Sequence, residues 1–224
     1  MYRNVSETAT SKHRPRIVLV EGNIASGKST FIELLKPLSG VKVISEPIKE
    51  WQNVDGHNLL DLFYQDTQRW SFAFQMFALL TRTKQLIAAH QENDAKICLL
   101  ERSLYSGMYC FSEEIRQKKL ISEAEYAVMD AHFNWILSYH RFRVDLIIYL
   151  QTSPSVCYER MKLRNRNEET NVSLTYLSEL HERHESWLIR KQLHVPGEVK
   201  LINANESLDA VEAEAKLLLK TWLN

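Results

Sequence analysis

The 224-residue sequence lacks any apolar run close to the ~20 residues that a membrane-spanning helix needs, so we expect no membrane partner. It also lacks an excess of either charge, because 28 Lys and Arg residues balance 28 Asp and Glu residues. With no overall field to attract a polyanion, we expect no nucleic-acid partner. Any anion that the protein binds must therefore be held by a local cluster of residues.

Cysteine is scarce as well. Cys98, Cys110 and Cys157 show no metal-ligand spacing and fit free thiols in a reducing compartment. We therefore expect a cytoplasmic protein, with the mitochondrion and the nucleus as alternatives. Residues 1–16 are rich in Ser and Thr and mildly basic, which predicts a flexible tail, with the remnant of an organelle-targeting peptide as the alternative.

Residues 17–224 contain no internal repeat and no linker rich in Pro, Gly or Ser, which predicts a single domain. Short apolar runs alternate with long amphipathic stretches, and continuous apolar character is typical of strands that are covered on both faces. The pattern predicts an α/β fold with a five-stranded parallel sheet and helices on both faces. The predicted strands are Ile17–Val20, Val41–Ile44, Ile97–Leu100, Leu146–Leu150 and Val199–Ile202.

Helical stretches separate these strands. The spacing of apolar residues predicts helices over Asn58–Tyr64, Arg69–His90 and Ser122–Tyr139, and Pro154 marks the start of another over Ser155–Asn165. The Ser122–Tyr139 stretch is long for the space available, which indicates a helical bundle that also serves a subunit interface.

A phosphate-binding loop follows the first predicted strand. Gly22, Gly27, Lys28 and Ser29 fit the pattern G-x-x-x-x-G-K-[ST], directly before a helix expected to begin near Thr30. In such loops backbone N–H groups wrap the phosphates, the lysine adds a positive charge, and the serine hydroxyl joins the Mg²⁺ shell. We therefore predict ATP and Mg²⁺ as cofactors, with the phosphates held by Gly22, Asn23, Ile24, Ala25, Ser26, Gly27, Lys28, Ser29 and Thr30.

Charged residues stand where the second and third strands end. Glu46 follows the second strand, and Glu101 and Arg102 follow the third, so all three face the edge where open α/β sheets bind ligands. Glu46 is placed to act as a base on an alcohol acceptor, and Glu101 to bind Mg²⁺. The alternatives are a solvated loop glutamate and a surface ion pair. An acceptor that already carries phosphate needs no such base, which separates nucleoside kinases from nucleotide kinases.

A basic segment follows the fourth strand. Arg160, Arg164 and Arg166 lie in a short span that predicts a mobile lid over the transferred phosphoryl group, with a solvated basic helix as the alternative.

The order of these motifs resembles that of the deoxyribonucleoside kinases, the group that includes insect multisubstrate, thymidine, deoxycytidine and deoxyguanosine kinases. The resemblance runs from about Ile17 to Ile189, and it implies a P-loop kinase fold, an ATP-dependent kinase of deoxynucleosides in nucleoside salvage, and a homodimer. It rests on the segments VEGNIASGKST, SEPIKEW, LLDLFYQD, RWSFAFQMFALL, LLERSLYSGMYCF, DLIIYLQTSP, YERMKLRNRNEE and YLSELHERHESWLI.

The resemblance also implies roles for single residues. Glu46 is implied as the general base on the sugar 5′-hydroxyl, Arg102 as the residue that positions it, and Tyr64 and Glu169 as ligands of the 3′-hydroxyl. Gln75 is implied to read the base edge and Phe111 to stack on the base, and the nucleoside pocket is expected to include Trp51, Phe63, Phe74, Ala78, Arg82 and Gly107. The aromatic residues have a second interpretation as ordinary core residues. The adenine of ATP is implied to lie near Ile202–Ser207.

Base preference depends on three positions of one helix face, Gln75, Ala78 and Arg82. A small residue followed by arginine resembles the deoxycytidine and deoxyguanosine kinases, which pair this arginine with an aspartate where this chain has Gly107. Arg82 thus either lacks its expected partner or points to solvent. We predict broad specificity that extends to purines. The alternatives are a pyrimidine-restricted thymidine or deoxycytidine kinase, a nucleoside-monophosphate kinase similar to thymidylate kinase, and a nucleotide-binding protein without activity.

Overall fold

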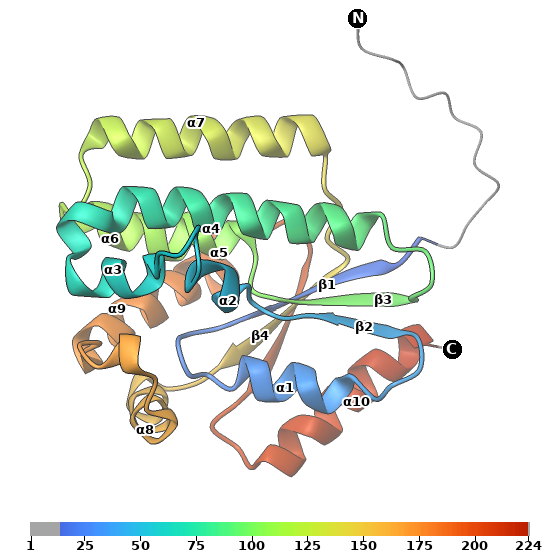
Figure 1. Ribbon diagram of the computed structural model, residues 1–224. Helices are drawn as coiled ribbons and strands as arrows, with labels where there is room; N and C mark the ends of the chain where they lie inside the picture. Colours follow the sequence, from blue (N-terminus) through green and yellow to red (C-terminus); the bar gives the residue numbers. More distant parts are fainter. Residues whose placement is uncertain (1–13, 224) are drawn as a thin grey trace, which may run out of the picture.

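A five-stranded, all-parallel sheet forms the centre of the computed structural model, which describes residues 14–223 (Figure 1). The strand order is β2-β3-β1-β4-β5, and Val18 of the central strand pairs with Leu99 on one side and with Leu146 on the other. The strands are β1 (Arg16–Glu21), β2 (Val41–Ile44), β3 (Ile97–Glu101), β4 (Leu146–Gln151) and β5 (Glu198–Asn203). The predicted parallel sheet is confirmed. The predicted tail, residues 1–16, falls mostly outside the described residues, and β1 begins at Arg16.

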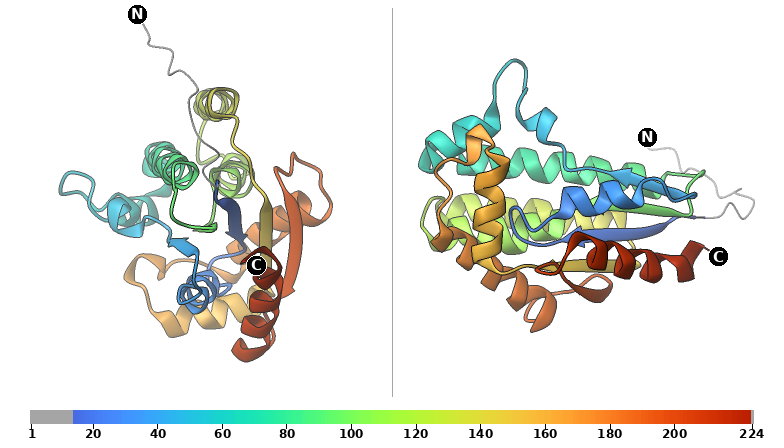
Figure 2. Two further views of the ribbon diagram at one scale, coloured as in Figure 1. Left: turned by 90° about the vertical axis from the view of Figure 1, so that its right-hand side faces the viewer. Right: turned by 90° about the horizontal axis from the view of Figure 1, so that it is seen from below.

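Helices cover both faces of the sheet, as predicted. In two further views, α1 and α10 lie against one face and α4 and α7 lie on the other side (Figure 2). The α-helices are α1 (Lys28–Leu35), α2 (Ile48–Trp51), α3 (Leu59–Gln65), α4 (Thr67–His90), α5 (Leu104–Ser106), α6 (Glu113–Gln117), α7 (Glu123–His140), α8 (Pro154–Arg164), α9 (Leu174–His184) and α10 (Leu208–Leu223). Two π-helical segments, η1 (Gly107–Ser112) and η3 (Glu185–Ile189), and a 3-10 turn, η2 (Asn167–Glu169), complete the elements. Within this described part of the chain, no helix is both long and apolar enough to cross a membrane.

Side-chain caps explain where several helices begin. The side chain of Asn58 accepts a hydrogen bond from the backbone N–H of Asp61 at 2.9 Å, and Asp66 does the same for Arg69 at 3.0 Å. Ser122 opens α7 with a capping box that Glu125 completes. Each cap satisfies a backbone donor that the first turn of a helix leaves unpaired. The sharp turn that Asp66 caps between α3 and α4 brings both helices to the ligand edge of the sheet.

The position of β1 between two layers of helices explains why its sequence is apolar without alternation. Ile17 and Leu19 pack in the core beneath α4 and α7, whereas Val18 and Val20 pack in the core beneath α1 and α10. All four side chains are fully buried. Because β1, β2 and β3 run in parallel, their carboxyl ends meet at a single edge, and the charged residues that follow them meet there too.

Candidate active site

One cavity of about 620 Å³ opens at the carboxyl-end edge of the sheet. It brings together most of the residues that the sequence predicted: the loop from Ile24 to Thr30 and Glu46, Trp51, Phe63, Tyr64, Phe74, Gln75, Arg82, Glu101, Arg102, Phe111, Arg160, Arg164, Arg166 and Glu169. Gly22, Asn23, Ala78 and Gly107, which the sequence also predicted, are not among the residues that line it. The cavity also reaches Ala204 and Glu206, in the segment expected near the adenine.

The phosphate loop holds its own lysine in place. Lys28 opens α1, two residues earlier than expected, and its Nζ donates to the carbonyl oxygen of Asn23 at 2.5 Å. The side chain of Asn23 donates to the carbonyl oxygen of Leu177 on α9 at 2.7 Å, which anchors the loop. Burial, and after it the positive charge of Arg102, lowers the pKa of Lys28 to about 7.

Glycine is required at the start of this loop. Gly22 has a φ of +148°, and a Cβ there would lie 2.7 Å from the Oγ of Ser26 and 2.8 Å from the carbonyl oxygen of Leu150. Both are closer than real Cβ contacts allow, and the second partner is rigid backbone. The strand–loop–helix turn therefore has room only for a residue without a side chain.

Oxygen ligands for a cation meet beside the loop. The Oγ of Ser29 donates to Oε1 of Glu101 at 2.6 Å, which joins α1 to the end of β3. Oε2 of Glu101 accepts from the backbone N–H of Glu46 at 3.3 Å, so the same carboxylate also joins β3 to the residue after β2. Hydroxyl and carboxylate oxygens are the ligand types that Mg²⁺ prefers, and the pair fits that ion.

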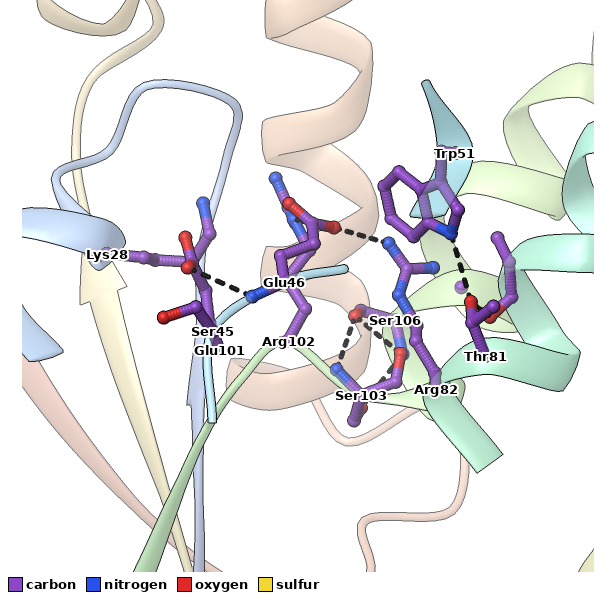
Figure 3. A network of polar contacts seen from close by, with 12 residues as sticks. Lys28, Ser45, Glu46, Trp51, Thr81, Arg82, Glu101, Arg102, Ser103 and Ser106 are labelled. Atoms are coloured by element: carbon purple, nitrogen blue, oxygen red, sulfur yellow. Dashed lines mark hydrogen bonds and ion pairs between the residues drawn. The ribbon is translucent and has the colours of Figure 1, made fainter. Parts of the chain in front are cut away.

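Glu46 lies between two guanidinium groups (Figure 3). Its Oε1 is 2.6 Å from Nη2 of Arg82 and 3.3 Å from Nε of Arg102. Burial alone would raise the pKa of Glu46, but the charges of Arg102, Arg82 and Lys28 together outweigh it and hold that pKa below its ordinary value. The carboxylate is therefore ionised, partly accessible from the cavity, and able to accept a proton.

Arg102 is fixed by its backbone as well as by its side chain. It adopts a left-handed φ of +63°, its N–H bonds to the carbonyl oxygen of Val20, and its Nη1 donates to the carbonyl oxygen of Gly22 at 2.9 Å. The next residue, Ser103, caps the short helix α5, as Figure 3 shows. A non-glycine residue in this conformation carries strain, which is common at functional sites.

Behind this turn lies a buried acid that the sequence analysis missed. Glu21, the last residue of β1, is fully buried, and its Oε1 accepts a hydrogen bond from the hydroxyl of Ser103 at 2.5 Å. Burial raises the pKa of Glu21 despite that hydrogen bond and the nearby Arg102. An acid that ends an apolar run immediately before the phosphate loop was the available signal.

Aromatic rings line the far end of the cavity. The ring of Phe74 stacks on Phe63 with centroids 4.7 Å apart and meets Trp51 edge-on at 5.3 Å. The indole N–H of Trp51 donates to the hydroxyl of Thr81 at 2.9 Å, which fixes the ring against α4. Gln75 is buried on the same helix, and its side chain lines the cavity. These rings form a flat, apolar slot with one amide in its wall.

Arg82 does not point to solvent. Its side chain is only 6% exposed, and it pairs with Glu46, so that alternative is wrong. The reason is the space left by Gly107, because a Cβ at that position would lie 2.9 Å from Nη1 of Arg82. Ala78, one turn earlier on α4, is buried.

Two of the three arginines that the sequence predicted to form a lid meet at one carboxylate. Arg164 and Arg166 both pair with Glu169, the latter at 2.9 Å from Nη1 to Oε1. Burial, and then the nearby Glu169, raises the pKa of Tyr64, so this phenol keeps its proton and can donate it. Arg160 reaches the phosphate loop, because its Nη1 would lie 3.8 Å from a Cβ added to Gly27.

Other lining residues were not assigned a role from the sequence. Tyr176 reaches the cavity from α9, at the start of the segment YLSELHERHESWLI, which contributed to the resemblance but was given no site residue. The remaining lining residues that the sequence analysis did not single out are all apolar: Phe31, Ile48, Leu60, Leu150, Leu208 and Val211.

Comparison with known proteins gives one consistent result. The family model described as deoxynucleoside kinase matches residues 18–224. The chain is 38% identical to human mitochondrial thymidine kinase 2, an alignment that covers 88% of this chain and 74% of that protein. It is 35% identical to human deoxycytidine kinase (80% of this chain, 78% of that protein) and 36% identical to chicken deoxycytidine kinase 2 (83% and 78%).

Proposed function

Because the chain belongs to the deoxynucleoside kinase family, we propose that it transfers the γ-phosphoryl group of ATP to the 5′-hydroxyl of a deoxynucleoside, within a single domain that spans residues 17–224. The position of Glu46 carries the proposal. An ionised carboxylate faces the phosphate loop across one cavity, held by two guanidinium groups, where an alcohol acceptor needs a base. An acceptor that already carries phosphate needs no base, so a nucleoside-monophosphate kinase would have no use for that carboxylate.

In the proposed reaction Glu46 accepts the proton of the 5′-hydroxyl as its oxygen forms a bond to the γ-phosphorus. The bond from that phosphorus to the β,γ-bridging oxygen breaks, and ADP leaves with the electron pair. Lys28 and the loop N–H groups hold the phosphates of ATP. Arg160, Arg164 and Arg166 stabilise the charge on the transferred group, once Arg164 and Arg166 turn from Glu169 toward it.

Ser29 and Glu101 would hold Mg²⁺. The ion would neutralise charge on the phosphates, and the two oxygen ligands are already 2.6 Å apart. Magnesium dependence is tested by measuring turnover with and without a chelator, together with Glu101→Gln, which should raise the Mg²⁺ concentration needed for half-maximal rate.

The nucleoside would occupy the aromatic slot. Trp51, Phe63, Phe74 and Phe111 offer ring faces and Gln75 an amide to the base, while Tyr64 and Glu169 would bind the 3′-hydroxyl. Because Ala78 is small and Arg82 offers a fork of donors on the cavity wall, we propose broad specificity that includes purines. Steady-state kcat/KM for the four deoxynucleosides tests this, and turnover of thymidine alone would reject it.

The reaction type is tested by ADP release from ATP and Mg²⁺ in three parallel assays, with deoxynucleosides, with deoxynucleoside monophosphates, and with neither. Release that depends on deoxynucleosides supports the proposal, whereas release that depends on monophosphates indicates the thymidylate-kinase-like alternative. Glu46→Gln should lower kcat by about 10²–10⁴-fold and leave nucleoside binding within a few-fold. Glu50→Gln, an exposed neighbour on α2, is the matched control.

For the quaternary structure we propose a homodimer formed through α7. Its outer face exposes Val128, Trp135 and Tyr139, and the rings of Trp135 and Tyr139 stack with centroids 5.3 Å apart. Exposed large apolar side chains in a row are typical of an interface. Sedimentation of the wild type and of a Trp135→Glu, Tyr139→Glu variant tests it, and an unchanged molar mass would reject this interface.

For the location we propose the cytoplasm, with the mitochondrion and the nucleus as alternatives. The relatives do not decide the location, because human thymidine kinase 2 is named as mitochondrial whereas the names of the deoxycytidine kinases give no compartment. Fluorescence microscopy of the full chain with a carboxyl-terminal tag distinguishes the three.

A further inference from the structure

The turn that carries Arg102 is strained and must be held by its surroundings. The φ of Arg102 is +63°, and a residue with a Cβ adopts this region at a cost of about 1–3 kcal/mol. Such a conformation persists only where several interactions fix it. The turn also determines where the guanidinium lies, and with it the 3.3 Å contact between Nε of Arg102 and Oε1 of Glu46. Whatever holds the turn therefore sets this contact as well.

Three consecutive residues at the end of β1 hold the turn, each through one hydrogen bond. The carbonyl oxygen of Val20 accepts from the backbone N–H of Arg102 at 2.9 Å. Oε1 of Glu21 accepts from the hydroxyl of Ser103 at 2.5 Å. The carbonyl oxygen of Gly22 accepts from Nη1 of Arg102 at 2.9 Å. The segment that leads into the phosphate loop is thus joined to the turn at three points.

Only one of these three acceptors belongs to a side chain. The other two are backbone carbonyl oxygens, which any residue offers, whereas the third requires an acceptor at position 21. Glu21 is fully buried, and its backbone pairs with Tyr149 of β4, so the carboxylate projects from the rigid centre of the sheet. The hydroxyl of Ser103 accepts in turn from the backbone N–H groups of Tyr105 and Ser106 and so caps α5.

Stability alone does not account for an acid at this position. Oε2 of Glu21 is buried and has no hydrogen-bond partner among residues 14–223. An unpaired buried polar atom is unfavourable by about 1–3 kcal/mol, and the charges of Arg102 and Arg82 offset part of that cost. An apolar side chain of the same length would avoid the cost altogether. The acid therefore has a role other than stabilising the core.

We propose that Glu21 is a positioning residue: through the hydroxyl of Ser103 it holds the turn of Arg102, and this turn fixes the phosphate loop relative to the carboxylate of Glu46. The proposal rests on the proposed function, since it takes the loop and Glu46 to be the two sides of the transfer reaction. Glu21 is not among the residues that line the cavity, so it acts through its neighbours rather than on a substrate. Its loss should therefore slow the reaction more than it weakens binding.

The first experiment compares Glu21→Met with Glu21→Gln. Glu21→Met removes the acceptor and keeps the length of the side chain. Its kcat should fall by about 10-fold to 100-fold, because small displacements of reacting groups cost that much, while KM for ATP and for the deoxynucleoside should stay within a few-fold. Glu21→Gln keeps an oxygen that can accept from Ser103, so its kcat should stay within a few-fold of the wild type. A normal kcat in Glu21→Met, or a Glu21→Gln variant that is equally slow, would overturn the role of this hydrogen bond.

Glu114→Met is the matched control for the loss of a buried acid. Glu114 lies on α6, is buried, pairs with Arg183 at 3.1 Å and is not on the cavity lining. Urea denaturation should show that both methionine variants are less stable than the wild type, but Glu114→Met should keep its kcat. Equal losses of kcat in the two variants would mean that general destabilisation slows the enzyme, which contradicts a positioning role.

Ser103→Ala tests the same bond from its other end and does not require Glu21→Met to fold. It should lower kcat by a similar factor, and the double variant with Glu21→Met should be no slower than the slower single variant. Ser122→Ala, which removes the cap of α7, is the control for a lost helix cap and should keep its kcat. A normal kcat in Ser103→Ala, or losses that multiply in the double variant, would reject the connection between Glu21 and Arg102.

A further measurement does not depend on turnover. Hydrogen–deuterium exchange of the Arg102 backbone amide, which bonds to Val20, should be at least about tenfold faster in Glu21→Met and Ser103→Ala, since the turn is then held by fewer bonds. It should be unchanged in the two control variants.

The exchange rates and the kinetics separate this proposal from the proposed function. Wild-type turnover of deoxynucleosides together with unchanged exchange in Glu21→Met and Ser103→Ala would overturn the positioning role and leave the kinase function intact. A wild type that turns over no deoxynucleoside would overturn the proposed function, and the part of Glu21 in the reaction with it, even if exchange at Arg102 is faster in both variants.

Discussion

Arg102 connects the two halves of the site, because its Nη1 bonds to the carbonyl oxygen of Gly22 at 2.9 Å while its Nε lies 3.3 Å from the carboxylate of Glu46. One guanidinium thus spans from the phosphate loop to the proposed base. Its carbon also lies 4.7 Å from the centroid of Phe111, over the ring. One rigid, planar group therefore connects the loop that would hold the phosphoryl donor to the carboxylate that would face the acceptor hydroxyl.

Arg102→Lys should therefore lower kcat/KM by on the order of 100-fold, because an ammonium cannot reach Gly22 and Glu46 together. Steady-state kinetics measures the effect. Arg143→Lys, on an arginine that pairs with Asp145 and is 68% exposed, should change kcat/KM by less than twofold. Near-normal kinetics of Arg102→Lys would mean that a point charge suffices and that the planar fork does not matter.

The affinity for ATP should fall as the pH rises above about 7. The pKa of Lys28 is lowered to about 7 in the free protein, first by burial and then by Arg102, and a bound polyphosphate favours its ammonium form. Binding above that pH takes up a proton, so the affinity decreases by up to about tenfold per pH unit. Calorimetric ATP titrations from about pH 7 to about pH 9 measure the slope.

Lys28→Arg should remove most of this slope, because arginine stays charged throughout the range. Lys36→Arg, on an exposed residue that follows the last residue of α1 and pairs with Glu33, should keep it. Equal slopes in all three proteins would assign the linkage to ATP itself rather than to Lys28.

The charged residues of the site could be predicted from sequence where their position depends on the sheet alone. Glu46, Glu101 and Arg102 directly follow apolar strands, and parallel strands place their carboxyl ends at one edge. The phosphate loop is a local motif whose glycines fit the observed turn. The sheet itself followed from continuous apolar runs, because both faces of its central strands are buried.

The partner of Arg82 could not be predicted in this way. Arg82 and Glu46 are 36 residues apart, and their contact depends on the direction of one long side chain and on a missing methyl group at Gly107. Similarly, Tyr176 lines the cavity from α9, far along the chain, and its place there follows from how α9 packs rather than from a local pattern. Side-chain partners across elements follow from packing volumes, and these are properties of the folded chain.

Gly22→Ala should destabilise the fold by more than Gly56→Ala. Both glycines have positive φ, +148° and +86°, so both variants carry backbone strain of about 1–3 kcal/mol. Only at Gly22 does the new Cβ also meet Ser26 and the backbone of Leu150, whereas nothing lies within 4 Å at Gly56. Urea denaturation of both variants measures the difference, and equal losses would show that the contacts at Gly22 relax without cost.

Acid should destabilise the protein partly through His184. This histidine is fully buried, its Nδ1 lies 2.7 Å from the carbonyl oxygen of Leu180, and its ring stacks parallel on Tyr149 with centroids 6.1 Å apart. Burial, with the charge of Arg102 second, lowers the pKa of His184 to about 3, against 6.5 for the ordinary side chain. Between these values the unfolded chain binds one more proton than the folded one, so the free energy of unfolding falls as the pH falls.

Below pH 6.5 this one group lowers the free energy of unfolding by up to about 1.4 kcal/mol for each pH unit, and above that pH it has no effect on that free energy. His184→Asn keeps a donor near Leu180 and removes the titrating ring, so the free energy of unfolding should depend less steeply on pH between about 6.5 and about 4. His57→Asn, at an exposed position, should keep the wild-type slope. Urea denaturation at a series of pH values measures all three slopes, and a wild-type slope in His184→Asn would mean that His184 is protonated in the folded protein as readily as in the unfolded chain.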